Sequence, residues 1–312
     1  MKKYIQNKVS ESKLTLPCMS VYALVCWLCC GLLQEGWWMQ LGGFVLTTYL
    51  MVELNNSNAL IRIYSRMVSC AFLMLSCMAC FLFPAIQGTL IQLFFVACYL
   101  ILFHAYQDTE SMGHAYYAFL LLGLASMVCI HMVFFLPLLW LFMLLNLQSL
   151  SVRTFCASLL GLLTPYWIAA GWLIYQEDFT LMTTHFLPLL EFQQPFELGL
   201  LTLSQLLTLA FVVILALTGT IHYIRTSYND KIRIRQLYSI FIWTDVVTII
   251  FLCVQPQHYD ILMRLLIINT APLIAHFIAL THTRITNIAF FVISVTALLL
   301  TAYNIWTSSS LF

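Results

Sequence analysis

Long apolar runs alternate with short polar connections along almost the whole chain. A helix needs about 20 apolar residues to cross the hydrocarbon core of a bilayer, and about eleven such runs fit the sequence. Since backbone groups in lipid must be bonded within the protein, this pattern predicts an all-α, polytopic membrane helix bundle, a single transmembrane domain over residues 1–312. The expected spans are 14–33, 37–52, 67–86, 89–106, 115–130, 132–148, 155–175, 198–222, 237–254, 261–279 and 286–306.

Composition excludes a sizeable soluble domain. Charged residues make up 8% of the chain and hydrophobic residues 62%, whereas soluble proteins carry roughly 25% charged residues. The net charge of +1 gives no general attraction for nucleic acid. The expected partners are therefore membrane lipids and other proteins of the inner membrane, and not nucleic acid.

If each of these spans crosses the membrane, the Lys and Arg residues lie almost entirely on one side of it. Of the 13 Lys and Arg residues, all except Arg264 share the side of the N-terminus. Because cytoplasmic loops carry the excess of Lys and Arg, we expect a cytoplasmic N-terminus and, with an odd number of spans, a periplasmic C-terminus in a bacterial inner membrane. The cations on this side are Lys2, Lys3, Lys8, Lys13, Arg62, Arg66, Arg153, Arg225, Lys231, Arg233, Arg235 and Arg284.

Three polar residues inside the expected spans form a candidate buried cluster. Asp245 lies near the middle of the span 237–254, and Arg264 and Asn269 lie in the next span. At a rise of about 1.5 Å per residue, Asn269 matches the depth of Asp245, and Arg264 lies nearer the outside. We expect Asp245 to bond to Arg264 or Asn269. Such a group is either a polar clasp between helices or a relay for protons or substrate.

Two cysteine motifs raise the question of a metal or redox site. Cys26, Cys29 and Cys30 form a CxxCC motif, and Cys77 and Cys80 form a CxxC motif. Paired CxxC units can bind zinc or exchange disulfides, but each motif here lies within an apolar helix, with no His or carboxylate beside it. We therefore expect these thiols to act as small packing residues, with no metal and no cofactor.

Glu35 directly follows the first expected span on the outer side, beside Trp37 and Trp38. A carboxylate in this position can serve as the base that deprotonates an acceptor in an enzyme using lipid-linked sugars. Alternatively, it is a solvated turn residue. Under the enzymatic interpretation, Glu35 is the candidate catalytic base, and Arg264 is the candidate contact for a lipid phosphate.

Two segments resemble known membrane families. The stretch from Phe119-Leu-Leu-Leu-Gly-Leu-Ala-Ser-Met to Phe135-Leu-Pro-Leu-Leu-Trp resembles a hairpin of the GT-C membrane glycosyltransferases, which implies a GT-C-like core. Glu53-Leu-Asn-Asn-Ser-Asn-Ala-Leu-Ile-Arg is similar to the inner turn of an uncharacterised polytopic inner-membrane family of Bacteroidota. That family is often mislabelled as carotene oxygenase, a chemistry that uses a four-His iron site on a soluble propeller, and nothing in this sequence supplies such a site.

The chain departs from the GT-C pattern where that family carries its chemistry. Those enzymes have a long first outer loop and outer cations, whereas this chain has a loop of about three residues and Arg264 alone. Without fixed positive charge, a phosphate leaving group lacks stabilisation. We therefore expect a non-catalytic inner-membrane protein, a subunit of an envelope-biogenesis or secretion assembly. The alternatives are a lipid-linked-sugar glycosyltransferase and a small-molecule or proton-coupled transporter.

Overall fold

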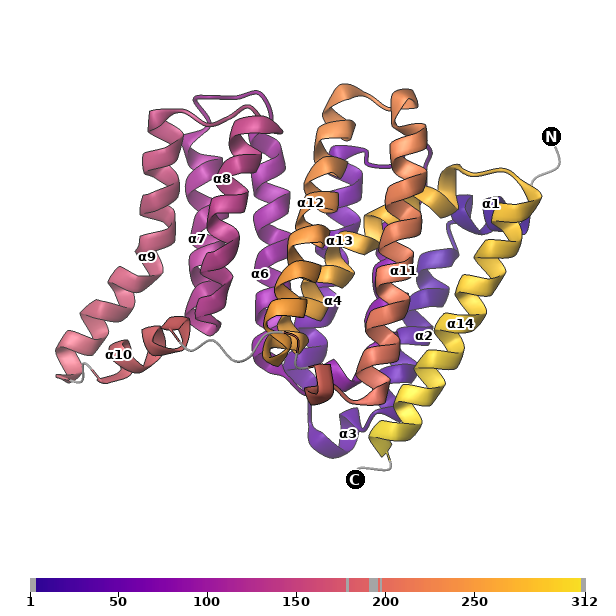
Figure 1. Cartoon of the computed structure of the whole chain (residues 1–312), viewed down its shortest axis with the longest axis horizontal. Helices are drawn as coiled ribbons and strands as arrows, with labels where there is room; N and C mark the ends of the chain where they lie inside the picture. The colour runs from indigo at the N-terminus through magenta and orange to yellow at the C-terminus, as the bar shows by residue number, and fades with distance from the viewer. Residues whose placement is uncertain (1–3, 178–179, 191–195, 197, 310–312) are drawn as a thin grey trace.

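In the computed structural model, the chain is a bundle of helices (Figure 1). The structure describes residues 4–177, 180–190, 196 and 198–309, and among these residues it contains no strand. The α-helices are α1 (Ile5–Glu11), α2 (Thr15–Cys29), α3 (Leu32–Glu35), α4 (Trp38–Asn58), α5 (Met67–Met78), α6 (Ile86–Leu102), α7 (Met112–Val128), α8 (Leu136–Leu145), α9 (Val152–Gln176), α10 (Thr180–Phe186), α11 (Leu203–Thr226), α12 (Ile232–Val254), α13 (Tyr259–Leu280) and α14 (Arg284–Ser309).

Short 3-10 helices extend or join several of these elements. They are η1 (Cys80–Leu82), η2 (Phe103–Ala105), η3 (Ile130–Phe135), η4 (Leu187–Leu190), η5 (Leu198–Leu200), η6 (Ser227–Asn229) and η7 (Pro256–His258).

The helices agree with the membrane class expected from the sequence. Each of the expected spans overlaps at least one helix. Among the described residues, 6 helical segments are long and apolar enough to cross a membrane, and α1 with α2, which meet at 89°, pass the same test as a bent pair. The all-α membrane bundle is therefore supported at this coarser level. The six segments are Ile86–Ala105, Val152–Gln176, Leu203–Asn229, Ile232–Val254, Pro256–Leu280 and Arg284–Thr307.

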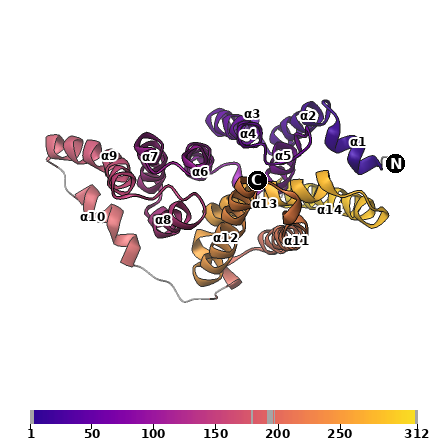
Figure 2. The ribbon, with the colours of Figure 1, turned by 90° about the horizontal axis from the view of Figure 1, so that it is seen from above.

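Helix α13 lies at the centre of the bundle. Figure 2 shows it surrounded by helices that come from both halves of the chain, and it packs against α5, α6, α11 and α12. In the apolar stretch of 18 residues that could cross a membrane, 89% of the α13 residues are buried inside the protein, compared with 11% of the α14 residues. A helix enclosed by other helices can carry polar side chains, because they find partners in protein rather than facing lipid.

Glycine sets the close approach of α7 and α9. A Cβ atom on Gly161 of α9 would lie 2.2 Å from the carbonyl oxygen of Tyr116, and one on Gly123 of α7 would lie 2.6 Å from that of Leu162. Neither distance leaves room for a side chain. Small residues at such crossings allow helix backbones to pack directly against each other in membranes.

Beyond this crossing, α9 leaves the bundle. Pro165 lies inside the helix, where it removes one backbone hydrogen bond and favours a bend. Figure 1 shows the second half of α9 turning away from α7, with the short α10 lying beneath the gap. The segment 176–197, which includes α10, is the connection that follows the end of α9, and part of it lies outside the described residues. It is the longest of the connections that the sequence places on the outer side of the membrane.

Helix α1 lies across one end of the bundle, and its polar side chains bind the end of α13. The Gln6 side-chain amide donates to the carbonyl of Ile278 and to the hydroxyl of Thr281, both at 2.6 Å. Asn7 donates to the carbonyl of Thr281 at 2.9 Å. Figure 1 places the last turns of α14 at the opposite end of the bundle.

Candidate functional site

Asp245 lies at the junction of α6, α12 and α13, where it is 3% exposed. The Thr270 hydroxyl of α13 donates to its Oδ2 at 3.2 Å, whereas Oδ1 has no hydrogen-bond partner among the described residues. Next to it, the Tyr99 hydroxyl lies 2.9 Å from both Thr244 Oγ1 and Asn269 Oδ1. The Tyr99 contacts thus join α6, α12 and α13, and the Thr270 contact adds a second bond between α12 and α13.

The prediction that Asp245 bonds to Arg264 or Asn269 was therefore wrong, although its partner does lie on the same helix, α13. Neither Arg264 nor Asn269 bonds to the carboxylate in the described structure. Thr270 does so instead, because it follows Asn269 by one residue and so faces a direction about 100° further around the helix. Asn269 turns its amide to the carbonyl of Leu265 at 2.8 Å.

Arg264 binds the turn that leads into α6. Its guanidinium donates to Thr89 Oγ1 at 3.3 Å, to Gln92 Oε1 at 3.2 Å, and to the carbonyls of Leu82 and Ala85. The space for it exists because residue 88 is glycine: a Cβ atom there would lie 2.5 Å from Arg264 Nε. No carboxylate pairs with this guanidinium in the part of the chain that the structure describes.

Glu35 and Arg264 have different surroundings. Glu35 is exposed at the end of α3, where Gly36 takes a positive φ of 69° and ends the helix. Arg264 is 5% exposed and lines a cavity of about 10 Å³ together with Trp27 and Ser76. A cavity of that size holds about one water molecule, so it offers no room for a sugar or a lipid phosphate.

The largest cavity described here and a smaller one beside it lie between α7, α9 and α10, and a separate cavity of about 390 Å³ lies between α2, α4 and α5. The first two have volumes of about 690 Å³ and about 170 Å³. They share Tyr166, Ala170 and Phe186, and together they are called the α9–α10 groove here. The larger cavity is lined by Val133, Leu162, Leu163, Tyr166, Trp167, Ala170, Gly171, Ile174 and Phe186. The smaller is lined by Met127, Tyr166, Ala169, Ala170, Leu173, His185 and Phe186.

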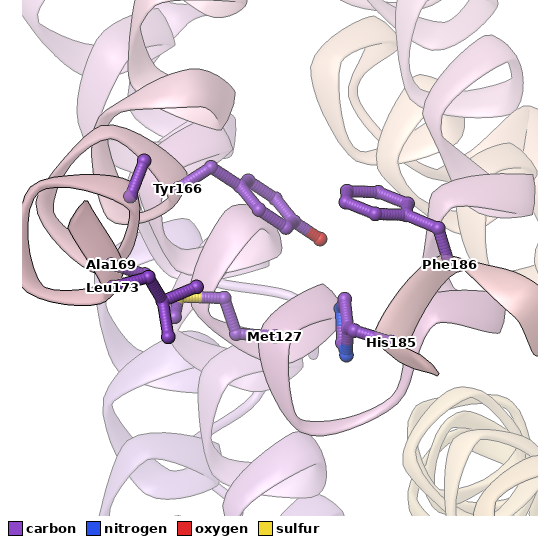
Figure 3. Close-up of a pocket in the computed structure, with 7 residues that line it drawn as sticks. Met127, Tyr166, Ala169, Leu173, His185 and Phe186 are labelled. Atoms are coloured by element: carbon purple, nitrogen blue, oxygen red, sulfur yellow. The ribbon is translucent and has the colours of Figure 1, made fainter. Parts of the chain in front are cut away.

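One corner of the α9–α10 groove is polar. Figure 3 shows the Tyr166 hydroxyl pointing across the smaller cavity toward Phe186 and His185. The rings of Tyr166 and Phe186 stack with centroids 5.8 Å apart, and the Tyr166 hydroxyl lies 2.7 Å from Ser126 Oγ. His185 Nε2 is buried with no hydrogen-bond partner in the described structure. An apolar groove with a polar corner suits an amphipathic ligand.

A second polar cluster lies at the α1 end of the bundle, and sequence reasoning missed it. Asp230 pairs with Arg62 Nε at 3.0 Å and with His276 Nε2 at 3.1 Å. Arg233 donates to Asn58 Oδ1 at 2.9 Å and to the Phe103 carbonyl. The sequence signal was small: one Asp in the basic connection 223–236, and one His inside an apolar span.

The two cysteine motifs lie on α2 and on the α5–η1 segment, and α2 packs against α5. Cys26, Cys77 and Cys80 are buried, whereas Cys30 is partly exposed and Cys29 is exposed. All 11 cysteines are thiols rather than disulfides. No group of three or more His, Cys, Asp or Glu side chains within the described residues is arranged to hold a metal ion.

Comparison with known proteins adds no relative. No protein-family model matches the chain, and no curated protein or solved structure is similar to it. The resemblances to the GT-C enzymes and to the Bacteroidota family therefore stay predictions.

Proposed function

We propose that this chain is a non-catalytic, multi-spanning inner-membrane protein that holds the apolar chain of a lipid in the α9–α10 groove, as a subunit of an envelope-biogenesis or secretion assembly. The observation that carries the proposal is the groove itself. Its volume of about 690 Å³ is within the range of specific ligand sites, which is roughly 300–1,000 Å³, and its lining is almost wholly apolar.

The placement of the groove favours a lipid as its occupant. It lies along α9, one of the helices long and apolar enough to cross a membrane, and large apolar side chains such as Trp167 and Ile168 are exposed along that helix. A lipid chain can reach the groove from the bilayer without crossing water. His185 Nε2 and the Tyr166 hydroxyl can then hydrogen-bond to the polar part of the same molecule.

The proposed membrane arrangement follows the cations. With about eleven spans, the α1 end of the bundle faces the cytoplasm, and the end of α14 and the polar corner of the groove face the periplasm. The pairing of Arg62 with Asp230 and the contact of Arg233 with Asn58 support one shared end for the connections that carry these cations.

Catalysis is the less favoured alternative, because its candidate residues do not share a site. A glycosyltransferase needs a base and a phosphate-binding cation around one cavity, whereas Glu35 is exposed and Arg264 is committed to Leu82, Ala85, Thr89 and Gln92. A proton-coupled transporter would rest on Asp245, whose one described hydrogen bond comes from Thr270. A clasp between helices explains that contact equally well.

The proposal is tested by blocking the groove without disturbing the fold. A Cβ atom on Gly171 would meet nothing within 4 Å, so Gly171→Trp fills the groove without a backbone clash. Ile168→Trp is the matched control, since Ile168 is 72% exposed on the same helix and does not line the groove. The wild type and the control should retain a co-purifying lipid in native mass spectrometry, and Gly171→Trp should lose it. Equal lipid content in all three proteins would refute lipid binding in the groove.

The assembly part of the proposal has a separate test. Gentle solubilisation of the tagged chain, followed by mass spectrometry of the proteins that stay bound, should recover specific inner-membrane partners in fixed ratio. A chain that purifies alone under all detergents, while retaining its lipid, would remove the subunit role and leave the lipid site standing.

A further inference from the structure

The cavity between α2, α4 and α5 is a second groove on the bundle. Both α2 and α4 pack against α5, and Figure 2 shows them on the same side of it, away from α9. The space between residues 16–27 of α2 and 41–52 of α4, with Leu73 of α5 also in its lining, has a volume of about 390 Å³. It is called the α2–α4 groove here. This volume is within the range of specific ligand sites, roughly 300–1,000 Å³.

The walls of the α2–α4 groove are mostly apolar, and its rim faces outward. Trp27 lines the groove and is 1% exposed, whereas Leu24 and Val45 line it and are 51% and 58% exposed. Both helices lie in expected membrane spans, 14–33 and 37–52. Exposed apolar side chains on such helices meet lipid tails, which are as apolar as Leu. The groove therefore opens toward the acyl chains of the bilayer.

The charge in this groove lies at one end of it. Arg66, which immediately precedes α5, is the one charged residue in the lining among the described residues. Leu16 in the first turn of α2 and Val52 near the end of α4 line the groove at this end. Trp27 and Leu41 line it toward the other ends of the two helices. The groove is thus cationic at one end and apolar along the rest of its length.

The Arg66 guanidinium is available to an anion. Its Nε donates to the Tyr64 hydroxyl at 3.2 Å, and its Cζ lies 6.0 Å from the centre of the Tyr64 ring. This contact uses one of the five N–H donors of the side chain. Within the part of the chain that the structure describes, no carboxylate forms an ion pair with Arg66. The remaining donors can bind a phosphate in the two-pronged geometry that Arg favours.

The segment before Arg66 is fixed at the α1 end of the bundle. The buried Ser65 hydroxyl donates to the carbonyl of Ser10 in α1 at 2.7 Å. The Asn55 side chain of α4 donates to the carbonyl of Ser65 at 2.9 Å. Lys13, in the connection between α1 and α2, is exposed at the same end. The cationic mouth of the groove therefore lies at the end of the bundle where the α1 segment meets α4, and not at mid-membrane.

We propose that the α2–α4 groove binds one anionic phospholipid, with its phosphate at Arg66 and an acyl chain along the groove toward Trp27. A lipid lying parallel to the helices has the same distribution of charge, an anion at one end followed by an apolar chain. The α9–α10 groove differs, because no Lys or Arg lines it among the described residues.

The leaflet that supplies this lipid follows from the proposed orientation. The α1 end then faces the cytoplasm, where anionic headgroups attract Lys and Arg side chains near the membrane surface. That assignment alone rests on the proposed function. Binding of the lipid rests on the groove and on Arg66.

The first test compares two lipids that differ in charge. The purified full chain in detergent is titrated with phosphatidylglycerol or phosphatidylethanolamine of the same acyl chains, and binding is followed by native mass spectrometry. The wild type should bind phosphatidylglycerol more tightly. Arg66→Gln should weaken that binding about fivefold, the effect of one cation near the membrane surface, and Arg66→Lys should retain the preference. Arg153→Gln is the matched control, since Arg153 is an exposed cation of the same expected side that lines none of the described cavities.

Three results of this test would overturn the proposal. The first is equal affinity of the wild type for the two lipids. The second is an equal loss in Arg66→Gln and Arg153→Gln. The third is displacement of the bound lipid by excess glycerol phosphate, which would show a site for free phosphate rather than for a lipid.

The second test locates the lipid. Phosphatidylglycerol with a photoreactive group in its acyl chain is cross-linked to the chain, and the labelled peptides are mapped. Labels should fall on α2 and α4, and Ser20→Trp should remove them, since Ser20 lines the groove. Val21→Trp is the matched control, because Val21 is 63% exposed on the same helix and does not line the groove. Gly171→Trp in the α9–α10 groove should leave the labels on α2 and α4 unchanged.

The failure of this inference is distinguishable from the failure of the proposed function. Labels confined to α9 and α10, or labels on α2 and α4 that persist in Ser20→Trp, would overturn the α2–α4 site and leave the α9–α10 groove standing. Loss of a co-purifying protein in Ser20→Trp, with unchanged lipid labelling, would assign the groove to a protein partner and overturn the proposal.

Discussion

Replacing Thr270 by Val removes a buried hydrogen bond while keeping the shape of the side chain. Thr270 is 0% exposed, and its hydroxyl is the sole described hydrogen-bond donor to the Asp245 carboxylate. Side-chain hydrogen bonds between helices in membranes average about 0.6 kcal/mol and reach about 1.7 kcal/mol. Leaving a buried acceptor unpaired costs about 1–3 kcal/mol. We therefore expect Thr270→Val to lower the free energy of unfolding by about 1–2 kcal/mol.

Thr248→Val is the matched control for this substitution. Thr248 is also 0% exposed, but its hydroxyl has no hydrogen-bond partner among the described residues. Replacing an unpaired buried hydroxyl by a methyl group should change the free energy of unfolding by less than about 0.5 kcal/mol, or raise it. Two threonines of the same type and burial thus differ in one respect, which is the carboxylate at Asp245.

Reversible unfolding in mixed micelles of increasing SDS content measures both variants against the wild type. Asp245→Asn retains an oxygen that accepts from Thr270, so its loss should be small, and Asp245→Leu should be clearly worse. Equal losses for the two threonine variants, or no loss for Thr270→Val, would refute the role of Thr270 as the partner that holds Asp245.

Three further outcomes are expected. Gly161→Ala should lower the free energy of unfolding by about 1–3 kcal/mol through overpacking, since its Cβ atom would lie 2.2 Å from the Tyr116 carbonyl oxygen. Gly171→Ala, where a Cβ atom meets nothing within 4 Å, should leave the stability unchanged or raise it by up to about 1 kcal/mol through helix propensity. Equal shifts of the melting temperature in the two variants would contradict the close packing of α7 against α9. Arg264→Met should lower the free energy of unfolding by at least about 2 kcal/mol, because it leaves buried carbonyls unpaired. Glu35→Gln should change the free energy of unfolding by less than about 0.5 kcal/mol and leave cellular glycans unchanged. Loss of one glycan at a normal protein level would instead favour a transferase. A reporter fused after the C-terminus should be active in the periplasm, and activity confined to the cytoplasm would refute the orientation.

The positions of the helices along the chain could be predicted from the sequence, whereas the rotation of each helix about its axis could not. Each expected span overlaps a helix because an apolar run of that length has to satisfy its backbone internally. The helix that contacts Asp245 was predicted from depth, but its partner was not, because Asn269 and Thr270 point in different directions at the same depth. Arg264 faces Gly88 and the η1–α6 turn. No pattern in the neighbouring sequence predicts that this glycine makes room for the Arg264 side chain.

Features that depend on several distant segments were not predictable either. The pairing of Asp230 with Arg62 and with His276 joins two connections and helix α13, which are far apart in the chain. The α9–α10 groove arises from the Gly123 and Gly161 crossing, the outward turn of α9 and the position of α10 together. The similar depth of the two cysteine motifs could be inferred from the sequence, but the packing of α2 beside α5 could not be predicted from hydropathy.

The enclosure of α13 has a consequence for the order in which the protein is made. This helix carries Arg264, Asn269 and Pro272, and an Arg in an inserting helix costs up to about 2.5–3.5 kcal/mol in the bilayer, the value for the helix centre. The helices that pack around it, α5, α6, α11 and α12, all precede it in the chain. Synthesis therefore delivers the carbonyls of the η1–α6 turn and the carboxylate of α12 to the membrane before α13 leaves the ribosome. A polar segment that is unfavourable in lipid alone thus meets its binding partners as soon as it enters the membrane.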